Sequence, residues 1–201
     1  MFIILAIPLG IAAGLVLGGR LERLAELHFR WTWLAVAGLA VQVILFSDLG
    51  LWIVERGLGP LVYLTSTAAV LTAVLGNLRL PGMVLVATGA LANLAAIVAN
   101  GGVMPTTRAA LESAGLADRP GFSNSAVLAD PRLDGLTDIF AIPAGIPLAN
   151  VFSVGDVLIG IGIALVIALG MRRATERPAP AGLVVPDAGL SGEDPPGPPI
   201  P

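Results

Sequence analysis

The chain contains no cysteine, one histidine and few charged residues of either sign, and all of its basic residues are arginine. The absence of cysteine excludes disulfides, thiolate nucleophiles, iron–sulfur clusters and cysteine-based zinc sites. The single histidine, His28, is too little for a histidine-rich metal site, so we expect neither a metal nor a cofactor. The net charge of −3 provides no attraction to nucleic acid, whose binding needs a clustered basic face.

Apolar residues are what the chain has in excess. Hydrophobic residues make up 56% of it and charged residues only 12%, and the mean hydropathy is +0.89. Soluble domains carry about 25% charged residues. This composition predicts that lipid, rather than water, surrounds most of the chain.

Five apolar stretches each have about the length that a helix needs to cross a hydrocarbon core of roughly 30 Å. They contain no Lys, Arg or Glu, and their only acid is Asp156. They comprise residues 1–19, 31–46, 58–76, 81–99 and 155–171. We therefore predict an all-α fold, a polytopic integral membrane bundle of five transmembrane helices over residues 1–172, with one long outer loop over residues 100–154.

The arginines predict how this bundle is oriented. If the five helices alternate in direction, one side of the membrane receives Arg20, Arg23, Arg30, Arg79, Arg172, Arg173 and Arg177. Short loops rich in arginine tend to remain in the cytoplasm, so we expect the N-terminus outside and the C-terminus in the cytoplasm. Residues 173–201 are rich in proline, and we expect them to form a disordered cytoplasmic tail.

Three glycines of the first apolar stretch, Gly10, Gly14 and Gly18, recur every four residues. This spacing places them on one face of a helix. Lipid provides no hydrophobic drive between helices, so helix contacts in a membrane depend on small residues and on a few polar bonds. We expect this face to pack inside the bundle, with dimer formation as the alternative.

Two amides, Gln42 and Asn93, fall within predicted helices. An unsatisfied amide in hydrocarbon costs several kcal/mol, so each should face the bundle and find a partner there. A hydrogen bond between helices is the general explanation for such residues. A role in contacting a substrate is the alternative.

The loop begins with Asn-Gly-Gly-Val-Met-Pro. Asn100, Gly101 and Gly102 tolerate the left-handed backbone conformation that ends a helix, and Pro105 prevents the helix from continuing. A short surface helix is predicted over residues 105–114. The end of the loop, residues 138–153, is too apolar for solvent, and Pro143 and Pro147 interrupt it.

We therefore expect residues 138–153 to form an extended strip that lies on the outer mouth of the bundle or dips into it. Ser153 then caps the fifth helix, and Asp156 completes a capping box. Asp156 has a second interpretation, because an acid at the membrane boundary can bind a cation or relay a proton. The polar residues that would converge on such a site are Gln42, Asn93, Asn100, Asp138, Asn150 and Asp156.

Two motifs, Asn-Gly-Gly-x-Met-Pro at residues 100–105 and Asn-Val-Phe-Ser-x-Gly-Asp at residues 150–156, together resemble a bacterial family. Its members are small integral membrane proteins of unassigned function. The resemblance covers roughly residues 1–172 and leaves out the tail. It implies a location in the bacterial cytoplasmic (inner) membrane and carries no catalytic residues with it.

Three functions remain open from the sequence. The first is a non-enzymatic accessory or assembly subunit whose outer loop meets a membrane-protein partner, or a homo-oligomer. The second is a small transporter, with Gln42, Asn93 and Asn100 along a polar path beneath the loop. The third is an enzyme acting on lipid headgroups, with Asp138 or Asp156 as a general base or metal ligand.

Overall fold

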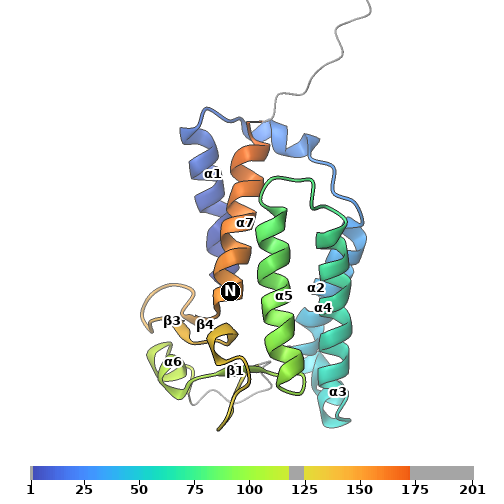
Figure 1. Cartoon of the computed structure of the whole chain (residues 1–201), viewed down its shortest axis with the longest axis vertical. Helices are drawn as coiled ribbons and strands as arrows, with labels where there is room; N and C mark the ends of the chain where they lie inside the picture. The colour runs from blue at the N-terminus through green and yellow to red at the C-terminus, as the bar shows by residue number, and fades with distance from the viewer. Residues whose placement is uncertain (1, 118–124, 173–201) are drawn as a thin grey trace, which may run out of the picture.

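The computed structural model describes residues 2–117 and 125–172, and the predicted proline-rich tail lies outside these residues. The described chain is mostly helical. Five long helices lie along the long axis of the molecule and alternate in direction (Figure 1). They are α1 (Ala6–Val16), α2 (Thr32–Leu45), α4 (Gly59–Leu75), α5 (Met83–Ala99) and α7 (Val154–Gly170).

Each long helix falls within one of the five apolar stretches or is offset from it by one residue, but several are shorter than their stretch. Residues with a positive φ set some of the ends: Trp31 (58°) precedes α2 and Gly82 (89°) precedes α5. Among the described residues, no single helix is both long and apolar enough to cross a membrane. By length and composition, only the bent pair Thr32–Leu45 and Asp48–Glu55, which turns by 86°, meets that test.

That bend separates α2 from two short elements, η3 (Asp48–Gly50) and α3 (Leu51–Glu55). Two further 3-10 turns flank α1, namely η1 (Phe2–Leu5) before it and η2 (Leu21–Glu26) after it. Gly50 is buried at the bend, where an added Cβ would lie 2.7 Å from the Cα of Leu45. The chain therefore turns sharply here because no side chain stands in the way.

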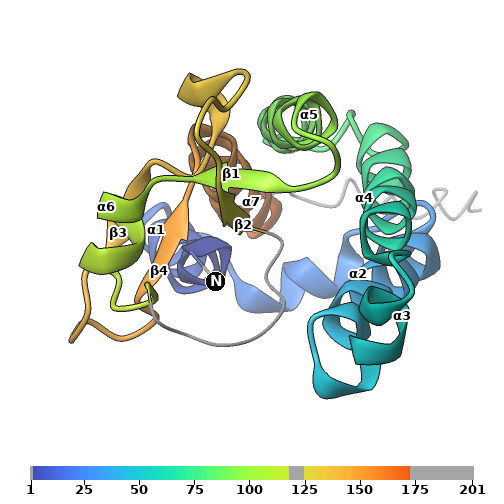
Figure 2. The same ribbon diagram turned by 90° about the horizontal axis from the view of Figure 1, so that it is seen from below.

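The long helices pack in a series rather than in chain order. α1 packs on α7, α7 on α5, α5 on α4 and α4 on α2, so that α1 and α2 occupy the two ends (Figure 2). A cluster of buried apolar residues joins α4, α5 and α7. Its members are Val74, Met83, Val86, Ala87 and Val166.

Small residues lie at the helix contacts. A Cβ added at Gly10 would lie 2.9 Å from the Cα of Ala164. A Cβ added at Gly14 would likewise come too close to the side chain of Met171 and would lie 3.2 Å from the Cα of Ala168. α1 and α7 therefore approach closely through Gly10 and Gly14, inside the bundle. Gly18 does not extend this face, because α1 ends at Val16 and Gly18 adopts a φ of 75° with open space around it.

The prediction of an all-α fold is wrong in the loop, where two small sheets form. β1 (Met104–Thr106) pairs in parallel with β2 (Ser125–Val127), and β3 (Phe140–Ile142) pairs antiparallel with β4 (Asn150–Phe152). They lie with α6 (Arg108–Ser113) and the turn η4 (Asp134–Leu136) at one end of the bundle (Figure 1). We call residues 100–117 and 125–153 the cap.

The cap differs in detail from the predicted loop. The expected helix over residues 105–114 is α6, which begins later because Met104–Thr106 form a strand and the Thr107 side chain accepts a hydrogen bond from the Ala110 N–H. The expected extended strip is the β3–β4 hairpin. Pro143 and Pro147 lie in its connection, where Gly145 has a φ of 92°.

Candidate functional site

Asn93, Ser153 and Asp156 form a closed ring of hydrogen bonds where α5 meets the start of α7. The Asn93 Nδ2 donates to Asp156 Oδ1 (2.8 Å), and the Ser153 hydroxyl donates to Asn93 Oδ1 (2.8 Å). The capping box completes the ring, because the Asp156 N–H donates to Ser153 Oγ (3.0 Å) and the Ser153 N–H donates to Asp156 Oδ2 (3.2 Å). The side chain of Asn93 on α5 thus bonds to both residues of the capping box at the start of α7 and joins the two helices.

Glycine makes room for this ring. A Cβ at Gly155 would overlap the Oδ1 of Asn93 and would lie 2.6 Å from its Cγ. One turn earlier on α5, a Cβ at Gly89 would lie 2.9 Å from the Cγ1 of Ile159. The two helices can therefore approach closely enough for Asn93 to reach Asp156 only because both positions lack a side chain.

Asp138 is a second buried polar residue, and it lies in the cap, where it bonds to both β1 and β2. Its N–H donates to the Pro105 carbonyl (2.9 Å), and its own carbonyl accepts from the Thr106 hydroxyl (2.9 Å), so its backbone is fixed to β1. Its carboxylate accepts from the Ser125 hydroxyl of β2 (3.0 Å). Only 6% of Asp138 is exposed.

Burial has a direct electrostatic consequence for Asp138. Desolvation raises the pKa of its carboxyl group to about 6, and the negative charge of Asp156 acts in the same direction. The hydrogen bond from Ser125 opposes both effects. The buried carboxyl group of Asp138 therefore holds its proton to a higher pH than an exposed aspartate does.

Asn100 lies outside the hydrogen-bonded ring and instead fixes a loop of the cap to the end of α5. Its Nδ2 donates to the carbonyls of Ala96 (2.7 Å) and Arg132 (2.8 Å), and its Oδ1 accepts from the Arg132 N–H (2.8 Å). The side chain thus holds both backbone groups of one loop residue against the end of α5. The following Gly101 and Gly102 have φ values of 73° and 95°, which suit a helix end.

The sequence analysis missed Asn77, which makes the same arrangement at the other end of the bundle. Its Nδ2 donates to the carbonyls of Ala73 (2.7 Å) and Arg30 (2.8 Å), and its Oδ1 accepts from the Arg30 N–H (2.8 Å). It is 6% exposed. The available signal was an Asn at a helix end, four residues after an Ala, as at Asn100.

The remaining predicted site residues make other contacts. The Nε2 of Gln42 donates to the Thr67 hydroxyl (3.1 Å), which joins α2 to α4. Asn150 pairs with Ile142 in the β3–β4 hairpin and is half-buried. Pro105 is buried in β1 and supplies the carbonyl that holds Asp138. Out of the larger predicted set, the structure therefore joins Asn93, Ser153 and Asp156 by hydrogen bonds, and Asp138 is held separately by β1 and β2.

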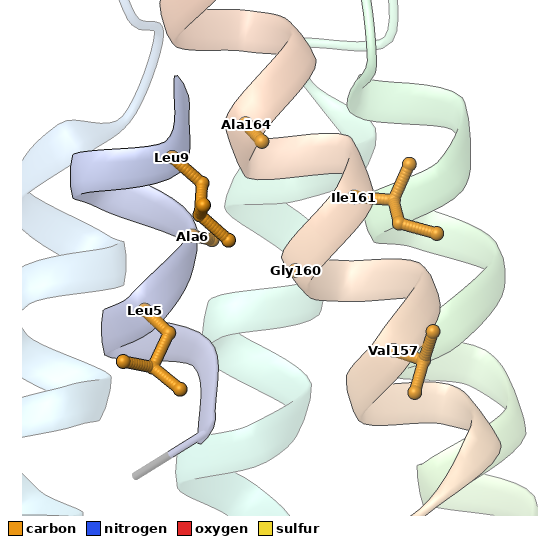
Figure 3. A pocket seen from close by; sticks show the side chains of 7 residues that line it. All are labelled: Leu5, Ala6, Leu9, Val157, Gly160, Ile161 and Ala164. Atoms are coloured by element: carbon orange, nitrogen blue, oxygen red, sulfur yellow. The ribbon is translucent and has the colours of Figure 1, made fainter. Parts of the chain in front are cut away.

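An apolar groove of about 180 Å³ runs between α1 and α7 (Figure 3). Its lining has no charged residue and consists of Leu5, Ala6, Leu9, Val157, Gly160, Ile161 and Ala164. Within the described residues, no group of three or more His, Cys, Asp or Glu side chains is placed to hold a metal ion.

These features define a mostly helical protein with a capped helix bundle, in which a polar ring joins two helices beneath the cap. The profile of the family of unknown function DUF5317 matches residues 26–168, and the chain belongs to this family. Membership in a family of unassigned function is thereby confirmed, although the match begins later than the expected residue 1. No curated protein and no solved structure matches the chain.

Proposed function

We propose that this protein is a multi-pass protein of the bacterial cytoplasmic membrane that acts as a non-enzymatic accessory or assembly subunit. The N-terminus and the cap face outward, and the C-terminus faces the cytoplasm. The lipid bilayer surrounds the long helices. A membrane-protein partner, or a second copy of the chain, contacts the cap.

The observation that carries the proposal is the apolar outer surface of the helices. Leu9 of α1, Val43 of α2 and Val84 of α5 are 65%, 70% and 61% exposed. Exposed apolar side chains occur on all five long helices, and the largest contiguous apolar patch on a soluble monomer is typically only about 300–600 Å². A bilayer accounts for these faces, because lipid tails are as apolar as the side chains.

The polar side chains inside the helices fit the same environment. Gln42 bonds to Thr67, and Asn93 bonds to Asp156 and Ser153. In hydrocarbon each polar group must find a partner within the protein, and such pairs also join helices. The polar groups therefore lie where a membrane bundle needs them.

The lengths of three of the helices are compatible with a thin hydrocarbon layer, whereas α1 and α2, with 11 and 14 residues, are shorter than the usual spanning range. α4, α5 and α7 each have 17 residues, which corresponds to about 25 Å at 1.5 Å per residue. This is at the lower end of the range of about 17–25 residues for spanning helices. Local thinning of the bilayer accommodates such helices at modest cost.

The assignment as an accessory subunit comes from the cap and from the amides. Ile139, Phe140 and Ile146 are exposed on the cap at 39%, 42% and 53%. Apolar residues in such a position suit contact with a partner. Transport along Gln42 and Asn93 is less well supported, because the two amides lie on different helix pairs and each is already bonded.

Affinity purification from native membranes tests the proposal. The full chain should remain in the membrane fraction after washing with alkaline carbonate, and one membrane protein should recur with it at near-equal amount. A triple variant with Ile139, Phe140 and Ile146 changed to Ser should lose that partner and stay in the membrane. Release by carbonate would contradict the membrane assignment, and recovery without any partner or second copy would contradict the role as a subunit.

A further inference from the structure

Arginine side chains gather at the end of the bundle opposite the cap. The turn η2 and the connection between α4 and α5 lie at this end, and α7 ends beside them (Figure 1). We call the described arginines of this end the arginine face, and two acids, Glu22 and Glu26, accompany them. The arginine face consists of Arg20, Arg23, Arg30, Arg79 and Arg172.

Hydrogen bonds hold the first part of this face at the end of α7. The Arg20 N–H donates to the Met171 carbonyl (2.9 Å), and the Arg23 Nη1 donates to the Arg172 carbonyl (3.1 Å). A guanidinium group is well placed there, because the last carbonyls of a helix carry partial negative charge. Three arginines, Arg20, Arg23 and Arg172, therefore meet where α7 ends.

Arg30 and Arg79 form the second part of the face, at the connection between α4 and α5. Asn77 in this connection bonds to the N–H and the carbonyl of Arg30 (2.8 Å each), and Arg79 follows two residues later. The guanidinium group of Arg30 lies 5.3 Å from the centre of the Trp31 ring. That ring packs on Gly76, where an added Cβ would lie 2.8 Å from it. Arg30 is therefore held in place although its side chain is exposed.

Much of the positive charge of the face is available to an external anion. In the described part of the chain, Arg20 pairs with Glu22 (3.4 Å), whereas Arg30, Arg79 and Arg172 are exposed and form no ion pair. At the opposite end, in α3 and the cap, acidic residues outnumber arginines among the described residues. The attraction for anions is therefore confined to one end of the bundle.

Exposed apolar and aromatic side chains lie among these arginines. They are Leu21, Phe29, Trp31, Trp33 and Leu78. Tryptophan side chains are enriched where a membrane meets water, with their rings at the level of the headgroups. A soluble anion would contact the charges only, whereas a phospholipid also covers the apolar side chains with its acyl chains. The mixture of side chains on this face therefore suits a phospholipid.

We propose that the arginine face binds the phosphate headgroups of anionic phospholipids and selects them over zwitterionic phospholipids. Arginine presents five N–H donors in a geometry that matches phosphate, and it stays charged. In a zwitterionic lipid the positive group of the headgroup opposes the attraction, so the selection follows from the net charge of the lipid. This inference rests on the membrane location proposed above, but not on the orientation of the bundle.

Quenching of tryptophan fluorescence by brominated lipids tests the proposal in the full chain reconstituted into bilayers. The chain has three tryptophans, and Trp52 lies in α3 at the opposite end. Trp52→Phe therefore leaves Trp31 and Trp33 as reporters beside the arginine face. The bilayers contain phosphatidylcholine and phosphatidylglycerol in varying proportion, with bromine on the acyl chains of one lipid or the other. The quenching then measures the relative affinity of the two lipids around the reporters.

One arginine near an anionic lipid surface changes the affinity by about fivefold. We expect at least this preference for phosphatidylglycerol in Trp52→Phe, and a value near equality when Arg30→Gln and Arg79→Gln are added. Arg56→Gln with Arg108→Gln removes the same charge from exposed positions at the opposite end and should keep the preference. No preference at the start, a preference that survives the first pair of substitutions, or an equal loss in both pairs would overturn the proposal.

Ionic strength provides a test that needs no arginine substitution. Salt screens exposed charges, so the preference should shrink as the salt concentration rises. A preference that does not respond to salt would overturn the proposal. Inorganic phosphate, compared with chloride at equal ionic strength, should leave the preference unchanged. Its loss in phosphate would assign the face to a soluble anion instead of a lipid.

The same experiment separates this inference from the membrane location on which it rests. Bilayers of brominated phosphatidylcholine alone should already quench Trp31 and Trp33, because both side chains are exposed. Absence of this quenching would contradict the membrane location, and the lipid selection would fall with it. Equal quenching by the two lipids would leave the membrane location intact and overturn the selection of anionic headgroups only.

Discussion

Asn93 and Asp156 lie 63 residues apart in the sequence and are joined by a 2.8 Å hydrogen bond between α5 and α7. The same amide group accepts a hydrogen bond from the Ser153 hydroxyl, so the Asn93 side chain bonds to both residues of the capping box of α7. This contact fixes the start of α7 to the bundle and sets the position of the hairpin that precedes it. The consequences of disturbing this ring can be measured directly.

Asn93→Leu should destabilise the protein by about 1–3 kcal/mol, because Asp156 Oδ1 and the Ser153 hydroxyl lose their partner. Thermal unfolding in detergent measures the loss. Thr88→Leu is the matched control, since Thr88 is exposed on the same helix and bonds only to its own backbone at Val84. Equal stability of the two variants would show that the ring contributes nothing.

Gly155→Ala should destabilise by a similar amount, about 1–3 kcal/mol, because the added methyl group occupies the space of the Asn93 side chain. Gly135→Ala is the control, because no atom lies within 4 Å of the position of its Cβ and its φ is not positive. The same unfolding assay applies. If Gly155→Ala is as stable as Gly135→Ala, the close approach of α5 and α7 at this point is wrong.

Asn77→Ala and Asn100→Ala should act locally and at opposite ends of the molecule. Each removes the bonds that hold one backbone position, Arg30 or Arg132, against a helix end. Hydrogen exchange followed by mass spectrometry should show faster exchange around Arg30 in the first variant and around Arg132 in the second. Exchange that rises at both sites in either variant would indicate global destabilisation instead.

The stability of the protein should depend on pH through Asp138. Its pKa is raised from 3.8 to about 6 in the folded state, so the folded protein loses stability as the pH rises through this interval, by about 3 kcal/mol in total. Asp138→Asn should remove that loss, whereas Asp130→Asn, which removes the same charge at an exposed position of the cap, should retain it. Unfolding temperatures measured across the interval provide the comparison, and identical profiles for the two variants would contradict the assignment.

The positions of the long helices could be predicted from the sequence because apolar stretches of this length admit few other structures. Their ends could not be predicted as well. Trp31 adopts a φ of 58°, which is unusual for a residue with a bulky side chain, and it starts α2 later than the apolar pattern begins. The strands of the cap have three residues each, too few to show an alternating pattern.

The individual polar residues of the site could be predicted from the sequence, but which of them bond to one another could not. The capping box of Ser153 and Asp156 is local in the sequence, so the spacing of its two residues was enough to predict it. The bond from Asn93 depends on which helices are neighbours and on Gly155, and neither is visible in a local pattern. The burial of Asp138 depends likewise on the pairing of distant strands.

Thiol labelling in intact cells tests most directly whether the bundle spans a membrane with its cap outside. Two variants of the cysteine-free chain are compared, Ile146→Cys in the cap and Leu78→Cys between α4 and α5, both at exposed positions. With an impermeant maleimide that has access to the periplasm, Ile146→Cys should react before lysis and Leu78→Cys only after it. Reaction of Leu78→Cys alone would reverse the orientation, and no reaction of either before lysis would contradict a cap exposed outside the membrane.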